Sequence, residues 1–163
     1  MNSREISAYK RKIMKYLIAD AELVDLVDPA HGVEYPDELL YKKIFPFNRV
    51  PATEEEVSVY ITVMVDIPRV YDRNDIARSV TVTIRIYAHE SLMGVDGQDG
   101  DRTDLISVRI DEMLNESFDF GIGYMVLVSN TEHVLDSKHH YREIIFKTDS
   151  LNSRRDGVNQ WSP

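Results

Sequence analysis

The chain has 163 residues, of which 43% are hydrophobic and 29% charged, and this is the size and composition of one globular domain. It contains no cysteine, which excludes disulfides, cysteine nucleophiles and thiolate-bound metals. A net charge of −9 argues against a protein that grips nucleic-acid phosphates with a basic surface.

Two helices are predicted at the start of the chain. Apolar residues recur at spacings of three and four, which predicts a helix over residues 4–18. Asp20 is a suitable cap for a short second helix that runs through Val27. Prolines then punctuate a long irregular connection, residues 29–56.

Two strands are predicted next. Apolar and polar residues alternate over residues 57–65 and again over residues 80–88, and this period of two is typical of half-buried strands. The stretch between them, residues 68–75, is rich in turn formers, so we expect an antiparallel hairpin with a long tip. A polar loop follows at residues 95–101.

The second half of the chain contains one more helix and two more strands. Helical spacing predicts a helix over residues 102–116 with Asp101 or Thr103 as its cap. The strands are expected over residues 124–129 and 141–148.

The order of these elements indicates an α+β fold, with an antiparallel sheet of about four strands and helices packed on one face. We expect a single domain over residues 1–149 with long loops. A flexible C-terminal tail, residues 150–163, is expected to carry the only tryptophan, Trp161.

Charge is unevenly distributed along the chain. Residues 1–18 contain five bases and one acid, whereas residues 20–38 contain seven acids and no lysine or arginine. Opposite patches of this kind can guide head-to-tail assembly. A basic helix face solvated beside an acidic loop is an equally good interpretation of the charges alone. The candidate contact residues are Lys10, Arg11, Lys15, Glu22, Asp25 and Trp161.

The common catalytic signatures are missing from the sequence. There is no Gly-x-Ser-x-Gly elbow, no phosphate-binding Gly-x-x-x-x-Gly-Lys loop and no Glu-x-Lys pair of the kind found in metal-dependent nucleases. We therefore expect no enzymatic activity and no cofactor. His133, His139 and His140 are predicted to be solvated near a hairpin end rather than to bind a metal.

Four aspartates lie in and just after the polar loop. Their spacing does not fit a calcium-binding EF-hand, because counting from Asp99 puts Asp104 at the sixth position and Ile110 at the twelfth. The acidic residues of this loop are Asp96, Asp99, Asp101 and Asp104. The family resemblance described below would place them toward the channel of a ring or toward a neighbouring ring.

Several segments together resemble the neck or tail-terminator proteins of tailed bacteriophages, over about residues 5–149. They are Ile44-Phe45-Pro46, Tyr60-Ile61-Thr62, Val82-Thr83-Ile84, Arg102-Thr103-Asp104-Leu105 with Ile110-Asp111, and Phe120-Gly121-Ile122-Gly123 followed by an apolar strand. The hairpin tip at residues 68–78, the acidic loop and the tail depart from that pattern.

The resemblance implies a structural virion protein. It would form a ring, commonly a hexamer, that ends growth of the tail tube and joins the tube to the head connector while DNA passes through without sequence-specific binding. The implied partners are the tail tube protein and the head-completion or connector protein. Assembly is expected in the host cytoplasm, without a membrane, because the chain begins with charged residues and has no long apolar run.

Two other functions fit the sequence. A head-completion adaptor that docks on the portal would share most of these features, and binding order would separate it from a terminator. A regulatory or nucleic-acid-binding module is less well supported, because no basic stripe with interleaved aromatic residues occurs outside the first helix.

Overall fold

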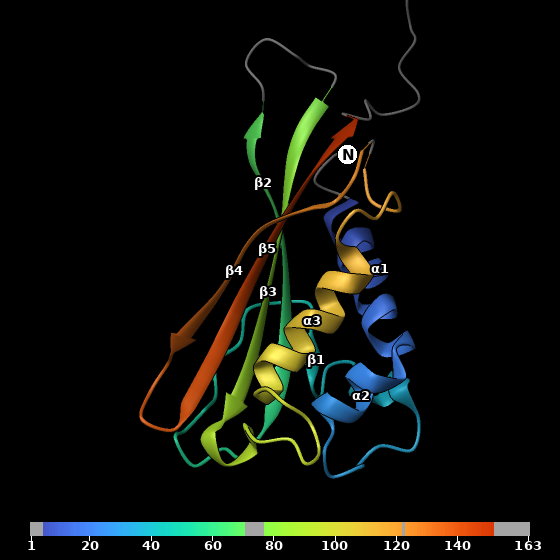
Figure 1. Ribbon diagram of the computed structural model, residues 1–163. Helices are drawn as coiled ribbons and strands as arrows, with labels where there is room; N and C mark the ends of the chain where they lie inside the picture. Colours follow the sequence, from blue (N-terminus) through green and yellow to red (C-terminus); the bar gives the residue numbers. More distant parts are fainter. Residues whose placement is uncertain (1–4, 71–76, 122, 152–163) are drawn as a thin grey trace, which may run out of the picture.

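A computed structural model describes residues 5–70, 77–121 and 123–151 (Figure 1). The helices and strands lie in two layers, with three helices against one face of a five-stranded sheet. In chain order the elements are α1 (Ile6–Ala19), α2 (Ala21–Val27), the 3-10 turn η2 (Pro36–Leu39), β1 (Ile44–Phe45), β2 (Val59–Val70), β3 (Ala77–His89), the 3-10 turn η3 (Glu90–Leu92), α3 (Arg102–Leu114), β4 (Val126–Val134) and β5 (His139–Leu151).

The strand order across the sheet is β1-β2-β3-β5-β4. All neighbours are antiparallel except β1, which pairs in parallel with β2. The predicted α+β class and the predicted hairpin of β2 and β3 are confirmed, and the sheet has one strand more than the four expected. The extra strand, β1, lies in the connection that was predicted to be irregular, and two residues are too few to show a period.

One residue ends the first helix and starts the second. Asp20 has an extended backbone, and its side chain accepts a hydrogen bond from the amide of Leu23 at 2.8 Å. This bond satisfies one of the free amides at the start of α2, as predicted for a capping aspartate. The chain therefore turns sharply between α1 and α2, and both helices keep an apolar face against the sheet.

The main core lies between the helices and the sheet. Every second residue of β3 from Val80 to Ala88 has no exposed surface, which is the alternation expected of a strand with one face covered. Ile13 and Leu17 of α1 and Ile110 of α3 pack onto this face and are also fully buried. The predicted buried faces of β2 and β3 are thus confirmed, except that Val57 precedes β2 and is 56% exposed.

A row of aromatic rings crosses the opposite face of the sheet. Tyr60, Tyr87 and Tyr141 occupy paired positions in β2, β3 and β5. Neighbouring rings are stacked, with centroids 5.0 Å apart for Tyr60 and Tyr87 and 5.1 Å apart for Tyr87 and Tyr141. The ring of Phe45 in β1 meets Tyr60 edge to face, with centroids 5.9 Å apart. Burial of the Tyr60 hydroxyl raises its pKa well above the usual value. These rings give the second face an apolar cluster of its own.

The connection before β2, residues 46–58, forms a strap that is fastened to the turn between β4 and β5. Ser137 and Lys138 donate hydrogen bonds to Glu54 and Glu55 at 3.0 and 2.9 Å. The Nε2 atom of His139 lies 2.8 Å from the carbonyl oxygen of Glu56. His139 is fully buried, so the prediction that this histidine is solvated is wrong.

Several predicted boundaries move in the second half of the chain. The predicted strand over residues 124–129 begins later and continues to Val134, while the helix ends at Leu114. The last strand continues through Ser150 to Leu151, so these two residues belong to the sheet and not to the predicted tail. The rest of that tail, including Trp161, lies outside the described residues.

Candidate subunit interface

β4 forms one border of the sheet. It pairs with β5 on one side, and no described strand pairs with the other side. Its sequence contains neither proline nor lysine, the residues that commonly protect an edge strand from pairing. Val126, Val128 and Val134 are 52%, 50% and 68% exposed. The edge is therefore both unpaired and partly apolar.

A β-bulge shapes the first half of β4. The register with β5 shifts between Leu127 and Ser129, so Val128 has no partner residue in β5. Leu127 packs against the core, and its amide donates a 3.0 Å hydrogen bond to the side chain of Asn115. Val126 and Val128, on either side of it, stay exposed. A bulge commonly redirects side chains near a strand end in this way.

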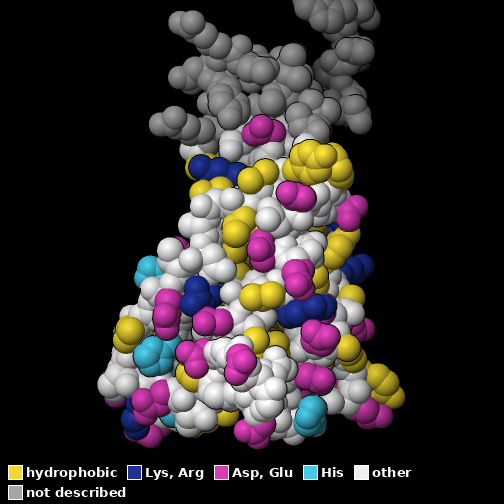
Figure 2. Space-filling view, viewed as in Figure 1, with side chains coloured by type: hydrophobic (Ala, Val, Ile, Leu, Met, Phe, Trp, Pro, Cys, Tyr) yellow, Lys and Arg dark blue, Asp and Glu magenta, His cyan; other side chains and the backbone are white. Residues whose placement is uncertain are grey.

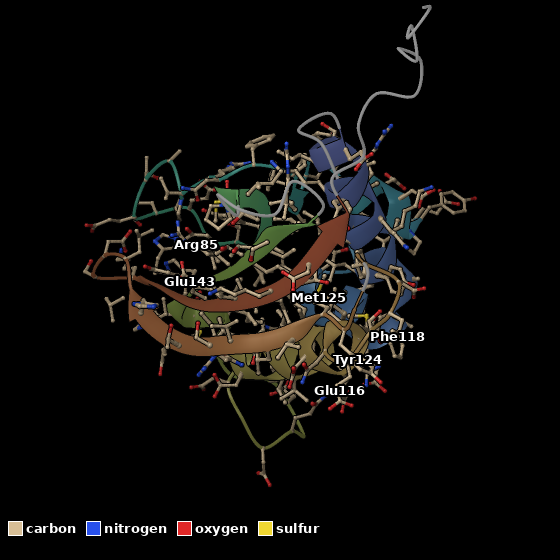
Figure 3. All side chains as sticks on the ribbon, turned by 90° about the horizontal axis from the view of Figure 1, so that it is seen from above. Arg85, Glu116, Phe118, Tyr124, Met125 and Glu143 are labelled. Atoms are coloured by element: carbon tan, nitrogen blue, oxygen red, sulfur yellow. The ribbon has the colours of Figure 1, made fainter. Side chains whose placement is uncertain are left out.

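Two exposed aromatic residues continue the apolar surface beyond β4. Phe118 is 67% exposed and Tyr124 is 52% exposed, and their ring centroids are 3.9 Å apart. Figure 3 shows both side chains on the outside of the loop between α3 and β4. We call these two residues and the two exposed valines beside Leu127 in β4 the apolar edge. It consists of Phe118, Tyr124, Val126 and Val128.

The loop that carries the aromatic pair is held firmly at its base. The amide of Glu116 donates to the carbonyl of Met125 at 2.7 Å, and the amide of Met125 donates to Ser117 at 2.9 Å. Met125 is fully buried. Gly121, at φ +76°, passes so close to β5 that a Cβ atom would lie 2.1 Å from the carbonyl oxygen of Asp149. The base of the loop is thus tied to the sheet by backbone hydrogen bonds and by the close approach of Gly121.

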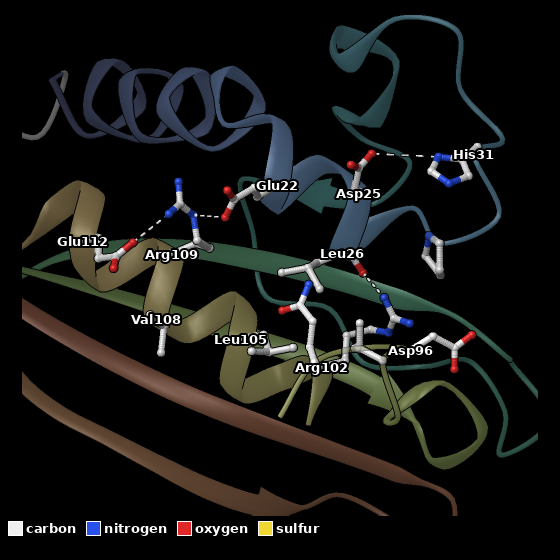
Figure 4. A pocket seen from close by; sticks show the side chains of 13 residues that line it. Glu22, Asp25, Leu26, His31, Asp96, Arg102, Leu105, Val108, Arg109 and Glu112 are labelled. Atoms are coloured by element: carbon white, nitrogen blue, oxygen red, sulfur yellow. Dashed lines mark hydrogen bonds and ion pairs between the residues drawn. The ribbon is translucent and has the colours of Figure 1, made fainter. Parts of the chain in front are cut away.

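A groove of about 550 Å³ lies between α2 and α3 on the helical side of the molecule (Figure 4). Leu26, Leu105 and Val108 provide apolar lining, and Val108 is 51% exposed. Acidic side chains surround them, namely Glu22, Asp25, Asp96 and Glu112. Figure 2 shows acidic side chains gathered over the lower half of the molecule, where α2 and the start of α3 lie.

The two arginines of the groove are already engaged within the subunit. Arg102 donates to the carbonyl oxygens of Leu92 at 2.6 Å and Leu26 at 2.9 Å, and burial lowers the pKa of its guanidinium. Arg109 pairs with Asp20, and with Glu22 and Glu112 at 3.4 and 2.8 Å. Asp25 and Asp96 are left without an arginine or lysine partner among the described residues.

The structure brings together some predicted contact residues and separates others. Glu22 and Asp25, predicted as subunit contacts, line the same groove as Asp96 from the acidic loop. Asp99 and Asp101 are exposed next to it. Asp101 precedes α3 as predicted, but its side chain makes no capping hydrogen bond.

Asp104 differs from the other three aspartates of the predicted set, because it has a partner within the subunit. It lies in the first turn of α3, where its carboxylate accepts a 2.8 Å hydrogen bond from Nε of Arg142 in β5. Arg142 also donates to Asn130 of β4 at 3.1 Å. The side chain of Asp104 therefore joins α3 to the sheet. The predicted helix over residues 102–116 already included Asp104, and its side chain is still 45% exposed, so its place in the channel-facing set stays a prediction.

The predicted basic residues lie on α1, away from the groove. Lys10 donates to the carbonyl oxygen of Pro46 at 2.8 Å. Arg11 and Lys15 are exposed, and they form no ion pair with any described residue. Lys10 and Arg11 line a separate hollow with Tyr41, and no residue of α1 lines the groove.

The apolar edge was missed by the sequence analysis. The run Val126-Leu127-Val128 held a signal, since consecutive apolar residues in a strand place side chains on both faces. A border strand with both faces apolar indicates contacts beyond the core. Phe118 and Tyr124 gave no comparable signal, because their proximity depends on the folding of the loop.

The described residues give no indication of a metal centre or a membrane span. Across residues 5–70, 77–121 and 123–151, no three His, Asp or Glu side chains gather in a way that could hold a metal ion. Within the same ranges, no helix has the length and apolar character needed to cross a bilayer.

Comparison with known sequences assigns the chain to a family. None of the curated proteins compared with it gives a significant match. A sequence model of the YomW family matches residues 11–148, from the first helix to the last strand. The match covers far more than half of the chain. The chain therefore belongs to the YomW family, a phage-related protein family.

Proposed function

We propose that this protein is a structural subunit of a bacteriophage neck. It forms a ring that ends the tail tube and joins the tube to the head connector, and it has no catalytic activity. The observation that carries the proposal is the apolar edge: a border strand open to pairing, with two exposed valines and an exposed aromatic pair beside it. Membership of a phage-related family supports it.

The apolar edge has the physical properties of an assembly contact. Exposed aromatic and branched side chains offer apolar area to a neighbour. Beyond Leu127, whose amide is already bonded to Asn115, the open side of β4 offers backbone hydrogen-bonding groups as well. Two hollows of about 540 and 570 Å³ share Tyr124 and Val126, so a partner's side chains can seat on both sides of them. A repeated contact between different surfaces closes into a ring when the rotation between subunits allows it.

The acidic loop fits a position facing the channel or an adjacent ring. Asp96, Asp99 and Asp101 are exposed, and several copies in a ring would repel DNA phosphates. DNA could then slide past without adhering. The partners in this proposal are other copies of the chain in a hexameric ring, the tail tube protein and the connector.

Mass and shape in solution test the proposal. The purified protein, alone or mixed with tube protein, is expected to form rings visible by negative staining and a ring-sized species by light scattering. Replacing Val126 and Val128 with lysine is expected to weaken assembly about a hundredfold, because the charges would have to be buried at the contact. The unfolding temperature should hardly change, since both side chains are exposed.

A matched control adds the same two charges elsewhere. Ala52 and Thr53 are exposed in the strap, so lysines there raise the net charge equally without touching β4. This control should assemble like the parent protein. A strictly monomeric parent, even with tube protein present, contradicts the proposal. Binding to the portal complex before any tube is present would instead identify a head-completion adaptor.

A further inference from the structure

The groove between α2 and α3 has a partly exposed apolar lining and unbalanced charge. Val108 is 51% exposed, although it lies among apolar groove residues. Among the described residues, Asp25 has a possible charged partner only in His31, at 3.9 Å, and both side chains are largely exposed. Asp96 forms no ion pair with a described residue. The groove therefore suits an occupant with aliphatic surface and positive charge.

The exposed face of α1 has the complementary chemistry. Arg11 and Lys15 are one helical turn apart on that face, which places them side by side. Ser7 and Ala8, on the same face, are small and exposed, so another surface can approach the helix closely. Long basic side chains cover apolar surface with their stems while their charged ends reach carboxylates.

Both surfaces belong to every copy of the chain, but they cannot meet within one copy. The groove is lined by α2, α3, the segment after Val27 and the loop before α3, and no residue of α1 contributes to it (Figure 4). Contact between them therefore requires two subunits. It joins unlike surfaces, so it is repeated head to tail, which is the kind of contact that builds rings.

We propose that the groove between α2 and α3 receives the exposed face of α1 from a second copy of this chain. Arg11 and Lys15 of one subunit lie against Asp25 and Asp96 of the next. This contact rests on the proposed ring and names one of its interfaces. The apolar edge supplies a separate contact, so the two can be tested independently.

A charge exchange tests the pairing. The first variant carries Arg11→Glu and Lys15→Glu, and the second carries Asp25→Lys and Asp96→Lys. Each variant alone is expected to assemble at least tenfold more weakly than the parent, because like charges then face each other. An equimolar mixture is expected to recover assembly, since the two variants can alternate with opposite charges at every contact. Sedimentation velocity measures the assembled fraction.

The control has the same change in charge as the first variant. It carries Lys42→Glu and Lys43→Glu, which lie outside the groove and α1, and it should assemble like the parent. Circular dichroism confirms that each variant is folded.

The outcomes separate this inference from the proposed function. If the parent forms rings and the first variant forms them equally well, the docking is wrong while the ring stands; this result is also expected if Arg11 and Lys15 contact DNA instead. If the mixture fails to recover assembly, the pairing of these two surfaces is wrong. If the parent never assembles, the ring itself is wrong.

Discussion

The two borders of the sheet differ in how open they are to pairing with a strand of another molecule. On the β2 side, β1 pairs with Ile61 and Thr62. Farther along, the register of β2 shifts between Asp66 and Arg69, and Pro68 within this stretch has no amide to donate. Cover, irregularity and proline are the usual ways to stop edge pairing.

The β4 side has no covering strand among the described residues and no proline, and it exposes valines; its irregularity is the bulge between Leu127 and Ser129. A border strand that is not used for contact is expected to be protected from pairing, as on the β2 side. A border left regular over most of nine residues, with apolar side chains, indicates a surface used for contact. The difference supports the proposal that subunits assemble through the β4 side.

The largest effect on stability is expected at the loop beside β4. Gly121→Ala should lower the free energy of unfolding by about 2–4 kcal/mol, because it combines a positive φ with a severe clash against β5. Assembly should fall as well, since this loop carries the aromatic pair. Gly123→Ala is the matched control, because no atom lies within 4 Å of its Cβ position. Chemical denaturation measures both, and equal stability of the two variants contradicts the prediction.

A smaller effect on stability is expected from a substitution in the helical layer, which leaves both border strands unchanged. The hydrogen bond from Arg109 holds the pKa of Asp20 below its usual value. Asp20→Asn keeps the cap of α2 but loses the ion pair, so stability at neutral pH should fall by about 1 kcal/mol while assembly through β4 is retained.

The pH dependence of this pair follows from the lowered pKa. The contribution of Asp20 is present above its unfolded pKa of about 4 and is lost as the pH falls through the lower folded value. Unfolding curves of parent and variant should therefore converge below about pH 4. A constant difference down to pH 2 would show that the charge of Asp20 is not the cause.

Opening the protected border provides the converse test. Pro68→Thr restores an amide and a strand-forming residue at an exposed position of β2. We expect a few-fold increase in non-specific association, seen as turbidity and large species by light scattering. If the variant behaves like the parent, the proline has no protective role, and the contrast between the two borders weakens.

The smallest effect is expected from the tail. Removing residues 152–163 takes away Trp161, a predicted contact residue, without removing any part of β5. The unfolding temperature should stay the same, and assembly should weaken by a few-fold if the tryptophan anchors a neighbour. Trp161→Ala should reproduce most of that loss. Unchanged assembly of both variants removes Trp161 from the interface.

Local patterns predicted most of the fold because its main elements are long and half-buried. The alternation in β2 and β3 and the helical spacing of α3 follow directly from one face being covered. β1 was missed because its two residues form a strand only by pairing with β2. The burial of His139 was missed because it depends on the strap, which arrives from more than eighty residues earlier in the chain.

The candidate interface was predictable only in part. Composition along the chain showed the basic segment and the acidic segment, and the fold keeps them on different surfaces. Asp104 is close to the loop in the chain, but its side chain is bonded to Arg142 of β5, a contact that spacing in the sequence does not show. The engagement of Arg102 and Arg109 depends on tertiary contacts, and no count of charges could reveal it.

The aromatic row across the second face of the sheet also has an optical consequence. Tyr60, Tyr87 and Tyr141 lie in three different strands with their rings stacked about 5 Å apart. Rings held in one fixed, asymmetric arrangement give a near-ultraviolet circular dichroism signal that disappears when side-chain packing is lost. The chain thus carries a built-in reporter that spans the centre of the sheet. A tyrosine band near 275–280 nm, about where phenols absorb, can follow the order of these strands while subunits assemble.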